Sequence, residues 1–208
     1  MQDRQDTQVQ GRTRWRRFAA MMVPSAALAG AVVFGISNGA LAASITVSGQ
    51  TFKVSASKLV GDGFTQYGGI ADEEGADPNN PLGKGHHPVA VSSIGTAKLY
   101  DLCQSVAVPG TPVVLTIRAG SSTGGKENPA IAKNMLIDMD SLEGEAVFDD
   151  IKIGRDAGAL GGAPGSFGQS AKTVTITDLR QVARYTSAAQ FSLTGLRLVV
   201  KTDGKECF

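Results

Sequence analysis

The chain has 208 residues, of which 42% are hydrophobic and 19% are charged, and its formal net charge is +1. This composition excludes a disordered polyampholyte and a polytopic membrane protein, and the length suits about one domain with a sizeable core. The charge is unevenly placed, because residues 1–42 carry +3 and the remainder, with 15 basic and 17 acidic side chains, carries −2. No basic stripe follows residue 42, which argues against nucleic acid as a partner.

The first 42 residues are typical of a signal sequence or a membrane anchor. Residues 12–17 are rich in arginine, residues 18–43 are uncharged, and Ala40-Leu41-Ala42 places small residues before a cleavage site between Ala42 and Ala43. The uncharged stretch is long enough to span a bilayer, although Pro24 and several glycines interrupt it. We predict a hydrophobic leader helix over 1–42, cleaved or retained as an anchor, and an extracytoplasmic β-rich domain over 43–208.

The first half of this domain shows four strand-like segments and one polar loop. Residues 45–56 alternate apolar and polar side chains, which is the period of a strand. Residues 61–84 contain glycines, five acidic side chains and two prolines, and predict a long polar loop. Strand-like sequence resumes at 88–91, 98–102 and 113–117.

The second half continues the same alternation of loops and strands. A Gly/Ser-rich loop is expected at 120–129, a hairpin over 134–142 and 146–153 that turns at Glu143-Gly144, and a Gly/Ala/Pro/Ser loop at 158–168. Strands are expected at 173–177 and 191–200, with a short helix as an option for 178–189. We predict an all-β single domain, an antiparallel β-sandwich or barrel-like fold.

A weak internal Asp–Leu repeat leaves one alternative fold open. An aspartate precedes Leu102, Leu142 and Leu179, at spacings of 40 and 37 residues. This period lies in the range of stacked β units. A short β-solenoid is therefore the alternative to the sandwich or barrel.

Cys103 and Cys207 are the two cysteines of the chain, and both follow the leader. Two cysteines in an exported chain predict one disulfide, with two free buried thiols as the alternative. A loop of roughly 100 residues would be closed, which the chain-entropy account values at about 4.7 kcal/mol.

One segment matches a motif of serine hydrolases. Residues 120–124, Gly-Ser-Ser-Thr-Gly, fit G-x-S-x-G, in which a tight strand-to-helix turn exposes the serine. The histidines of the chain, His86 and His87, precede Ser122, whereas in that fold the histidine follows the serine. We interpret the match as a loop composition and predict no catalytic residue, with Ser122, His86 and His87 as weak candidates.

The sequence also contains side chains that could serve a metal site or acid–base catalysis. His86 and His87 lie near an acidic run whose oxygens suit Zn²⁺ or Ca²⁺, but no helical spacing preorganises them. We predict a solvated loop, no metal and no cofactor. The pairs Asp138/Asp140 and Asp149/Asp150 are expected to face water.

Several segments together resemble a known family. They are residues 43–54, 63–68, 101–105, 148–154 and the ending Lys205-Glu-Cys-Phe208. The chain resembles a family of exported actinobacterial proteins of unknown function, some of which carry an automated label as cholesterol esterase. The resemblance implies an envelope or secreted location and transfers no catalytic residue.

Three functions follow in order of preference. The first is a non-enzymatic domain of the cell envelope or secreted fluid that binds a lipid, a glycan or a protein, with an acyl chain held between apolar faces as one form of it. The second is a lipid or sterol ester hydrolase in which His86 or His87 activates Ser122. The third is a structural or assembly protein that docks through strand edges, on a membrane protein for example. The oligomeric state is left open.

Overall fold

The structure is a computed structural model and describes residues 46–80, 83–121 and 127–208. These residues belong to the compact unit Ser44–Phe208, which is separate from the unit Met1–Ala43. The expected leader helix and the expected cleavage site at Ala42 and Ala43 lie outside the described residues. Across the described ranges, no helix is long and apolar enough to cross a membrane.

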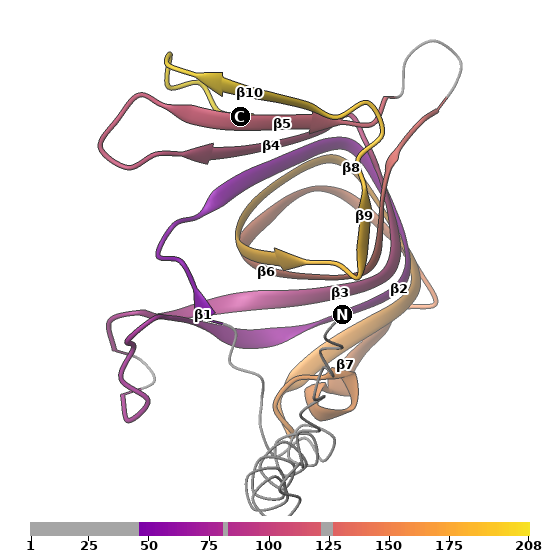
Figure 1. Ribbon diagram of the computed structural model, residues 1–208. Helices are drawn as coiled ribbons and strands as arrows, with labels where there is room; N and C mark the ends of the chain where they lie inside the picture. Colours follow the sequence, from indigo (N-terminus) through magenta and orange to yellow (C-terminus); the bar gives the residue numbers. More distant parts are fainter. Residues whose placement is uncertain (1–45, 81–82, 122–126) are drawn as a thin grey trace, which may run out of the picture. The chain divides into compact units, whose positions relative to one another are not determined.

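Four long strands form a closed antiparallel barrel (Figure 1). They are β2 (Phe52–Glu73), β3 (His86–Tyr100), β6 (Ala130–Asp149) and β8 (Phe167–Ser187). β2 pairs with β3 and β8, and β6 pairs with the same two strands, so the ring of hydrogen bonds closes on itself. The prediction of an all-β, antiparallel, barrel-like fold is confirmed. The solenoid alternative is wrong, since the strands of the ring are antiparallel rather than stacked in parallel.

Shorter strands extend the barrel. β4 (Leu102–Ala107), β5 (Val114–Ala119) and β10 (Arg197–Lys201) continue from β2 in the order β10-β5-β4-β2, and we call β4, β5 and β10 the C-terminal sheet. At other places β1 (Thr46–Val47) pairs with β2, β7 (Lys152–Asp156) with β8, and β9 (Gln190–Ser192) with β6. The 3₁₀-helix η1 (Ala157–Leu160) follows β7.

The barrel is filled by side chains that alternate along its four strands. Large residues such as Leu59, Ile94 and Leu179 are 4% exposed or less, and each stabilises the fold by about 1.5–3 kcal/mol through burial. Four alanines are fully buried among them: Ala97, Ala130, Ala132 and Ala183. Small side chains are needed because a ring of so few strands is narrow, and large and small residues must fill it together.

The long strands bend where a residue takes a left-handed backbone conformation. Asp101 and Asp178 have φ values of 50° and 52°, a region that aspartate tolerates better than most residues. Each is followed by a buried leucine, Leu102 or Leu179, which turns into the core. Two copies of the Asp–Leu repeat therefore mark strand bends. The third copy differs because its leucine, Leu142, is exposed.

Three sequence-based expectations are wrong. Residues 178–189 are not helical, since most of them lie in β8. The polar loop expected at 61–84 is shorter, because residues 61–73 belong to β2. The hairpin expected across Glu143-Gly144 is one continuous strand, β6, in which Gly144 (φ 149°) accompanies a shift of register rather than a turn.

Gly120 follows β5 at the point where the chain meets the barrel wall. Its φ is +73°, and a Cβ atom there would lie 2.8 Å from the carbonyl oxygen of Leu99 and 3.0 Å from the amide nitrogen of Ala130. Its own amide donates to the carbonyl oxygen of Thr194 at 2.7 Å. Only glycine fits both the conformation and the close approach of three backbone segments.

Candidate binding surface

The end of the chain is tied to one face of the C-terminal sheet. Cys103 on β4 forms a disulfide with Cys207, as the sequence predicted. The amide of Cys207 donates to Oγ of Ser105 at 3.0 Å, and Lys53 lies 2.6 Å from the carboxylate of Glu206. Disulfides persist in oxidising compartments, so this bond is consistent with an extracytoplasmic location.

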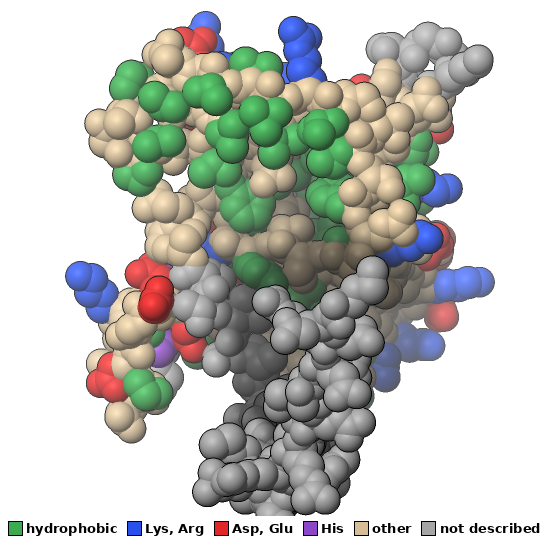
Figure 2. Space-filling model, viewed as in Figure 1, with side chains coloured by type: hydrophobic (Ala, Val, Ile, Leu, Met, Phe, Trp, Pro, Cys, Tyr) green, Lys and Arg blue, Asp and Glu red, His purple; other side chains and the backbone are tan. Residues whose placement is uncertain are grey.

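The opposite face of this sheet is apolar, and it is exposed on β10 and half-buried on β4 and β5. Directly paired residues share a face of a sheet, and the register places Leu198 beside Ile117, and Val200 beside Leu115 and then Val106. Leu198 and Val200 are 56% and 60% exposed. Figure 2 shows hydrophobic side chains gathered over β4, β5 and β10.

Three cations stand on the tail-bearing face of the same sheet. Arg197 is paired directly with Arg118. Lys201 follows Arg197 by four residues on β10, so the two side chains project from the same face of the strand. Among the described residues, none of the three has an acidic partner within salt-bridge distance. Two like charges directly opposite each other are destabilising unless an anion lies between them.

β10 exposes both of its faces and one edge. It ends the strand order, so its backbone pairs with β5 on one side and with no described strand on the other. Sequence reasoning assigned 191–200 to one strand and attached no function to it. The alternation Leu196-Arg197-Leu198 was the available signal, since an exposed strand with one apolar and one cationic face is amphipathic in the way of a surface helix.

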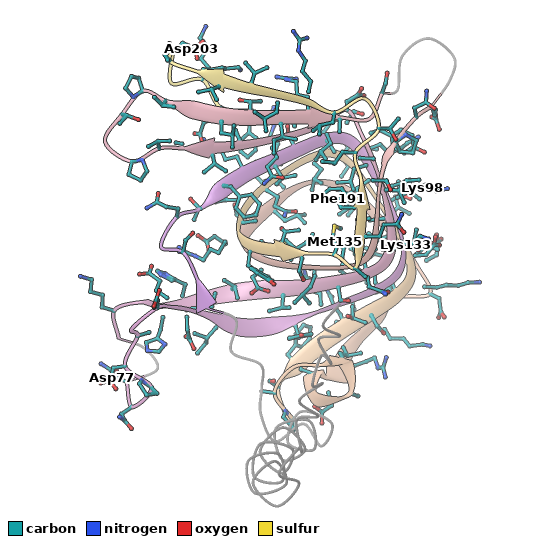
Figure 3. All side chains as sticks on the ribbon, in the orientation of Figure 1. Asp77, Lys98, Lys133, Met135, Phe191 and Asp203 are labelled. Atoms are coloured by element: carbon teal, nitrogen blue, oxygen red, sulfur yellow. A yellow bond between two sulfur atoms is a disulfide. The ribbon has the colours of Figure 1, made fainter. Side chains whose placement is uncertain are left out.

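The mouth of the barrel, by contrast, is nearly full. A cavity of about 30 Å³ lies among Val54, Met135, Leu179, Gln181 and Phe191. In Figure 3 Met135 lies inside the ring and Phe191 lies beside it, from β9. Pockets for drug-sized ligands measure about 300–1,000 Å³. This cavity is large enough for a water molecule and too small for an acyl chain or a sterol.

The two histidines lie at the end of β2 and β3 and are paired there with acidic residues. Nδ1 of His86 is 2.7 Å from Oδ1 of Asp72 and its Nε2 is 2.9 Å from the carbonyl oxygen of Asp77, while Nε2 of His87 is 2.6 Å from Glu73. Both neighbours of His86 are acceptors, so both ring nitrogens must carry a proton for both bonds to form. The hydrogen bond to Asp72, followed by that to Asp77, raises the pKa of His86 above its ordinary value.

The acidic contacts of the two histidines concern two hypotheses from the sequence, a serine hydrolase and a metal site. In the described part of the chain, no three metal-ligating side chains come together. Ser122 lies outside the described residues, which resume at Glu127 after the 122–126 gap.

Asp138 differs from its expected position. The sequence predicts that its carboxylate faces water, yet the residue is 6% exposed and Oδ1 has no hydrogen-bond partner among the described residues. It lies on the outer wall of the barrel, paired with Val91 and Tyr185, near an apolar cluster that includes Tyr67. Burial raises the pKa of Asp138, and the pKa of Tyr67 is raised by burial and by the nearby Asp138 charge. A two-residue alternation could not reveal this cluster, because its members come from four strands.

A protein-family profile described as a family of unknown function (DUF6230) matches residues 48–208. No curated protein and no solved structure matches the chain.

Proposed function

Since this chain belongs to DUF6230, a family of unknown function, we propose its function from the geometry: it is an exported, non-enzymatic domain that binds a partner in the cell envelope through its C-terminal sheet. Export and an actinobacterial source rest on the leader and on the resemblance of its sequence. Binding rests on the uncovered apolar face of β4, β5 and β10.

The exposed apolar side chains are concentrated on this sheet and its flanking segments. The described residues include thirteen exposed large hydrophobic side chains. Six of them lie on residues 102–121 and 196–208, about a fifth of the described chain: Val108, Leu196, Leu198, Val199, Val200 and Phe208. Of these, Leu198 and Val200 belong to the apolar face, whereas Val199 projects on the Arg197 side of β10 and Phe208 packs with Lys53. Exposed apolar side chains gathered in one part of a soluble domain mark interaction sites. The nearly filled barrel directs the proposal to this surface rather than to an internal ligand.

The test compares where the protein resides in its host. A variant with Leu198→Gln and Val200→Thr removes the apolar contacts and keeps residues of similar size on the strand. We expect it to move from the envelope fraction to the culture fluid. The matched control is Val147→Thr with Ile153→Gln, which changes two side chains that are 64% and 66% exposed on β6 and β7. Equal distribution of both variants and the wild type would contradict the proposal.

Self-assembly is the second candidate, and one observation favours it. The part of β6 from residue 141 to 149 pairs with β8 on one side and with no described strand on the other. This edge carries Glu143, Glu145 and Asp149, whereas β10 carries Arg197 and Lys201, so the two edges are complementary in charge. Sedimentation equilibrium tests this candidate: a monomer at micromolar concentration speaks against it.

A further inference from the structure

We infer that the partner of the C-terminal sheet is the surface of an anionic lipid bilayer, in which β10 lies at the level of the headgroups. This inference rests on the proposed function and names the occupant of its site. It follows from three properties of β10 and its surroundings: the separation of apolar and cationic faces, the distribution of charge over the domain, and the open strand edge.

The two faces of β10 match the two layers of a membrane interface. Leu198 and Val200 project from one face, and Arg197 and Lys201 from the other, with Arg118 beside Arg197. Amphipathic helices lie in the interface with their apolar faces about 5–10 Å deep, and the alternating faces of β10 present the same two kinds of side chain to it. Arginine and lysine side chains are long enough to reach the phosphates while their stems stay in apolar surroundings.

Charge separates this sheet from the rest of the domain. Residues 102–121 and 196–208 carry four basic and two acidic side chains, and one of the acids, Glu206, is paired with Lys53. The other described residues carry ten basic and fifteen acidic side chains. An anionic surface would therefore attract the C-terminal sheet and repel the remainder, which orients the domain with β10 toward the lipid.

The same charges disfavour symmetric pairing of β10 with the β10 of a second copy. Antiparallel pairing of two β10 strands about Val199 would place Arg197 of each copy opposite Lys201 of the other. Like charges opposite each other on paired strands are destabilising. The phosphate oxygens of lipid headgroups, in contrast, accept hydrogen bonds from both the arginines and the unpaired amides of the edge.

The experiment is vesicle flotation with the full chain, in whatever processed form its host produces. Vesicles of phosphatidylcholine alone are compared with vesicles that also contain phosphatidylglycerol, at low and at high salt. Binding to neutral vesicles measures the contribution that does not depend on lipid charge, from the apolar face and from any N-terminal segment that is retained. We expect at least tenfold tighter binding to the anionic vesicles, and loss of most of this preference at high salt.

Two pairs of variants test the residues. Arg197→Gln with Lys201→Gln should weaken binding to anionic vesicles by about fivefold per cation, whereas the matched control Lys152→Gln with Arg155→Gln should leave it unchanged. Leu198→Gln with Val200→Thr should weaken binding further, and Val147→Thr with Ile153→Gln should not. Each variant is first checked for its disulfide by mass and for its fold by circular dichroism.

The outcomes separate this inference from the function on which it rests. Equal binding to neutral and anionic vesicles, or equal effects of the test and control pairs, overturns the lipid assignment. The variant Leu198→Gln with Val200→Thr could be lost from the envelope fraction in cells while the wild type binds neither kind of vesicle. In that case the proposed function stands and its partner is a protein or glycan. A dimer that is dissociated by Leu198→Gln with Val200→Thr also overturns the lipid assignment.

Discussion

Removal of the disulfide should reveal how much the tail of the chain contributes to the stability of the barrel. The variant Cys103→Ala with Cys207→Ala avoids a leftover free thiol. The bond spans 104 positions of the sequence, and closure of a loop of about 100 residues is valued at about 4.7 kcal/mol on the chain-entropy account. Measured losses for native disulfides are typically about 2–5 kcal/mol.

The contacts that remain are too weak to replace the bond. The Lys53–Glu206 pair is partly exposed, and such pairs contribute about 0–1 kcal/mol. The Cys207 amide keeps its hydrogen bond to Ser105, worth about 1 kcal/mol net. We therefore expect a loss of about 3–5 kcal/mol in the free energy of unfolding.

Guanidinium unfolding of the variant and of the oxidised wild type measures this loss. The wild type in a reducing buffer is the second reference, and it should unfold at nearly the same midpoint as the variant. A loss under about 1 kcal/mol in both would refute the reasoning. It would mean either that the tail is already detached in the native state or that the unfolded chain stays compact around residues 103–207.

Three further predictions concern single positions. Gly120→Ala should cost about 3 kcal/mol in chemical unfolding because backbone atoms block its Cβ, whereas Gly110→Ala, with a similar φ but open space, should cost about 1–2 kcal/mol; equal costs would contradict the packing argument. The raised pKa of Asp138 means that stability falls as pH rises from about 3.8 through that raised value. Asp138→Asn should match the wild type in acid and melt at a higher temperature at neutral pH; parallel curves would sink this account. The pKa of His86 is raised because hydrogen bonds to Asp72 and to the carbonyl oxygen of Asp77 favour its protonated form. Its stabilising pairing with Asp72 is therefore complete below pH 6.5 and is lost as pH rises through the raised pKa. Limited proteolysis of residues 74–85 should accelerate over that interval in the wild type, and a His86→Gln variant should show no such pH dependence.

The fold class could be predicted because it depends on local patterns. Alternation of apolar and polar residues and an abundance of glycine indicate strands, and both are read over a few neighbouring positions. The limits of the strands could not be read in the same way. Residues 61–73 contain four glycines and several acidic side chains, yet they lie in β2 because β3 pairs with them as far as Asp72 and β8 as far as Tyr67.

The aspartates illustrate the same limit. The sequence shows Asp101 and Asp178 as copies of a weak Asp–Leu repeat. Only the closed ring of strands shows that they bend strands and direct a leucine inward. Asp138 looked like any outward residue of a strand. Its burial depends on Val91 and Tyr185, which are about 47 residues away in either direction along the chain and become neighbours only in the sheet.

What the sequence by itself determined is the β character of the domain and the pairing of its two cysteines, since only one pairing exists. Closure of the barrel, the size of its cavity and the uncovered face of the C-terminal sheet were decided by tertiary structure. The physical reason is that a side chain's environment is set by its cross-strand neighbours, and here these come from segments up to 131 residues apart, as when Phe52 pairs with Ala183. Leu198 and Val200 carry the binding proposal because β10 is the last strand of its sheet, a position that no local pattern encodes.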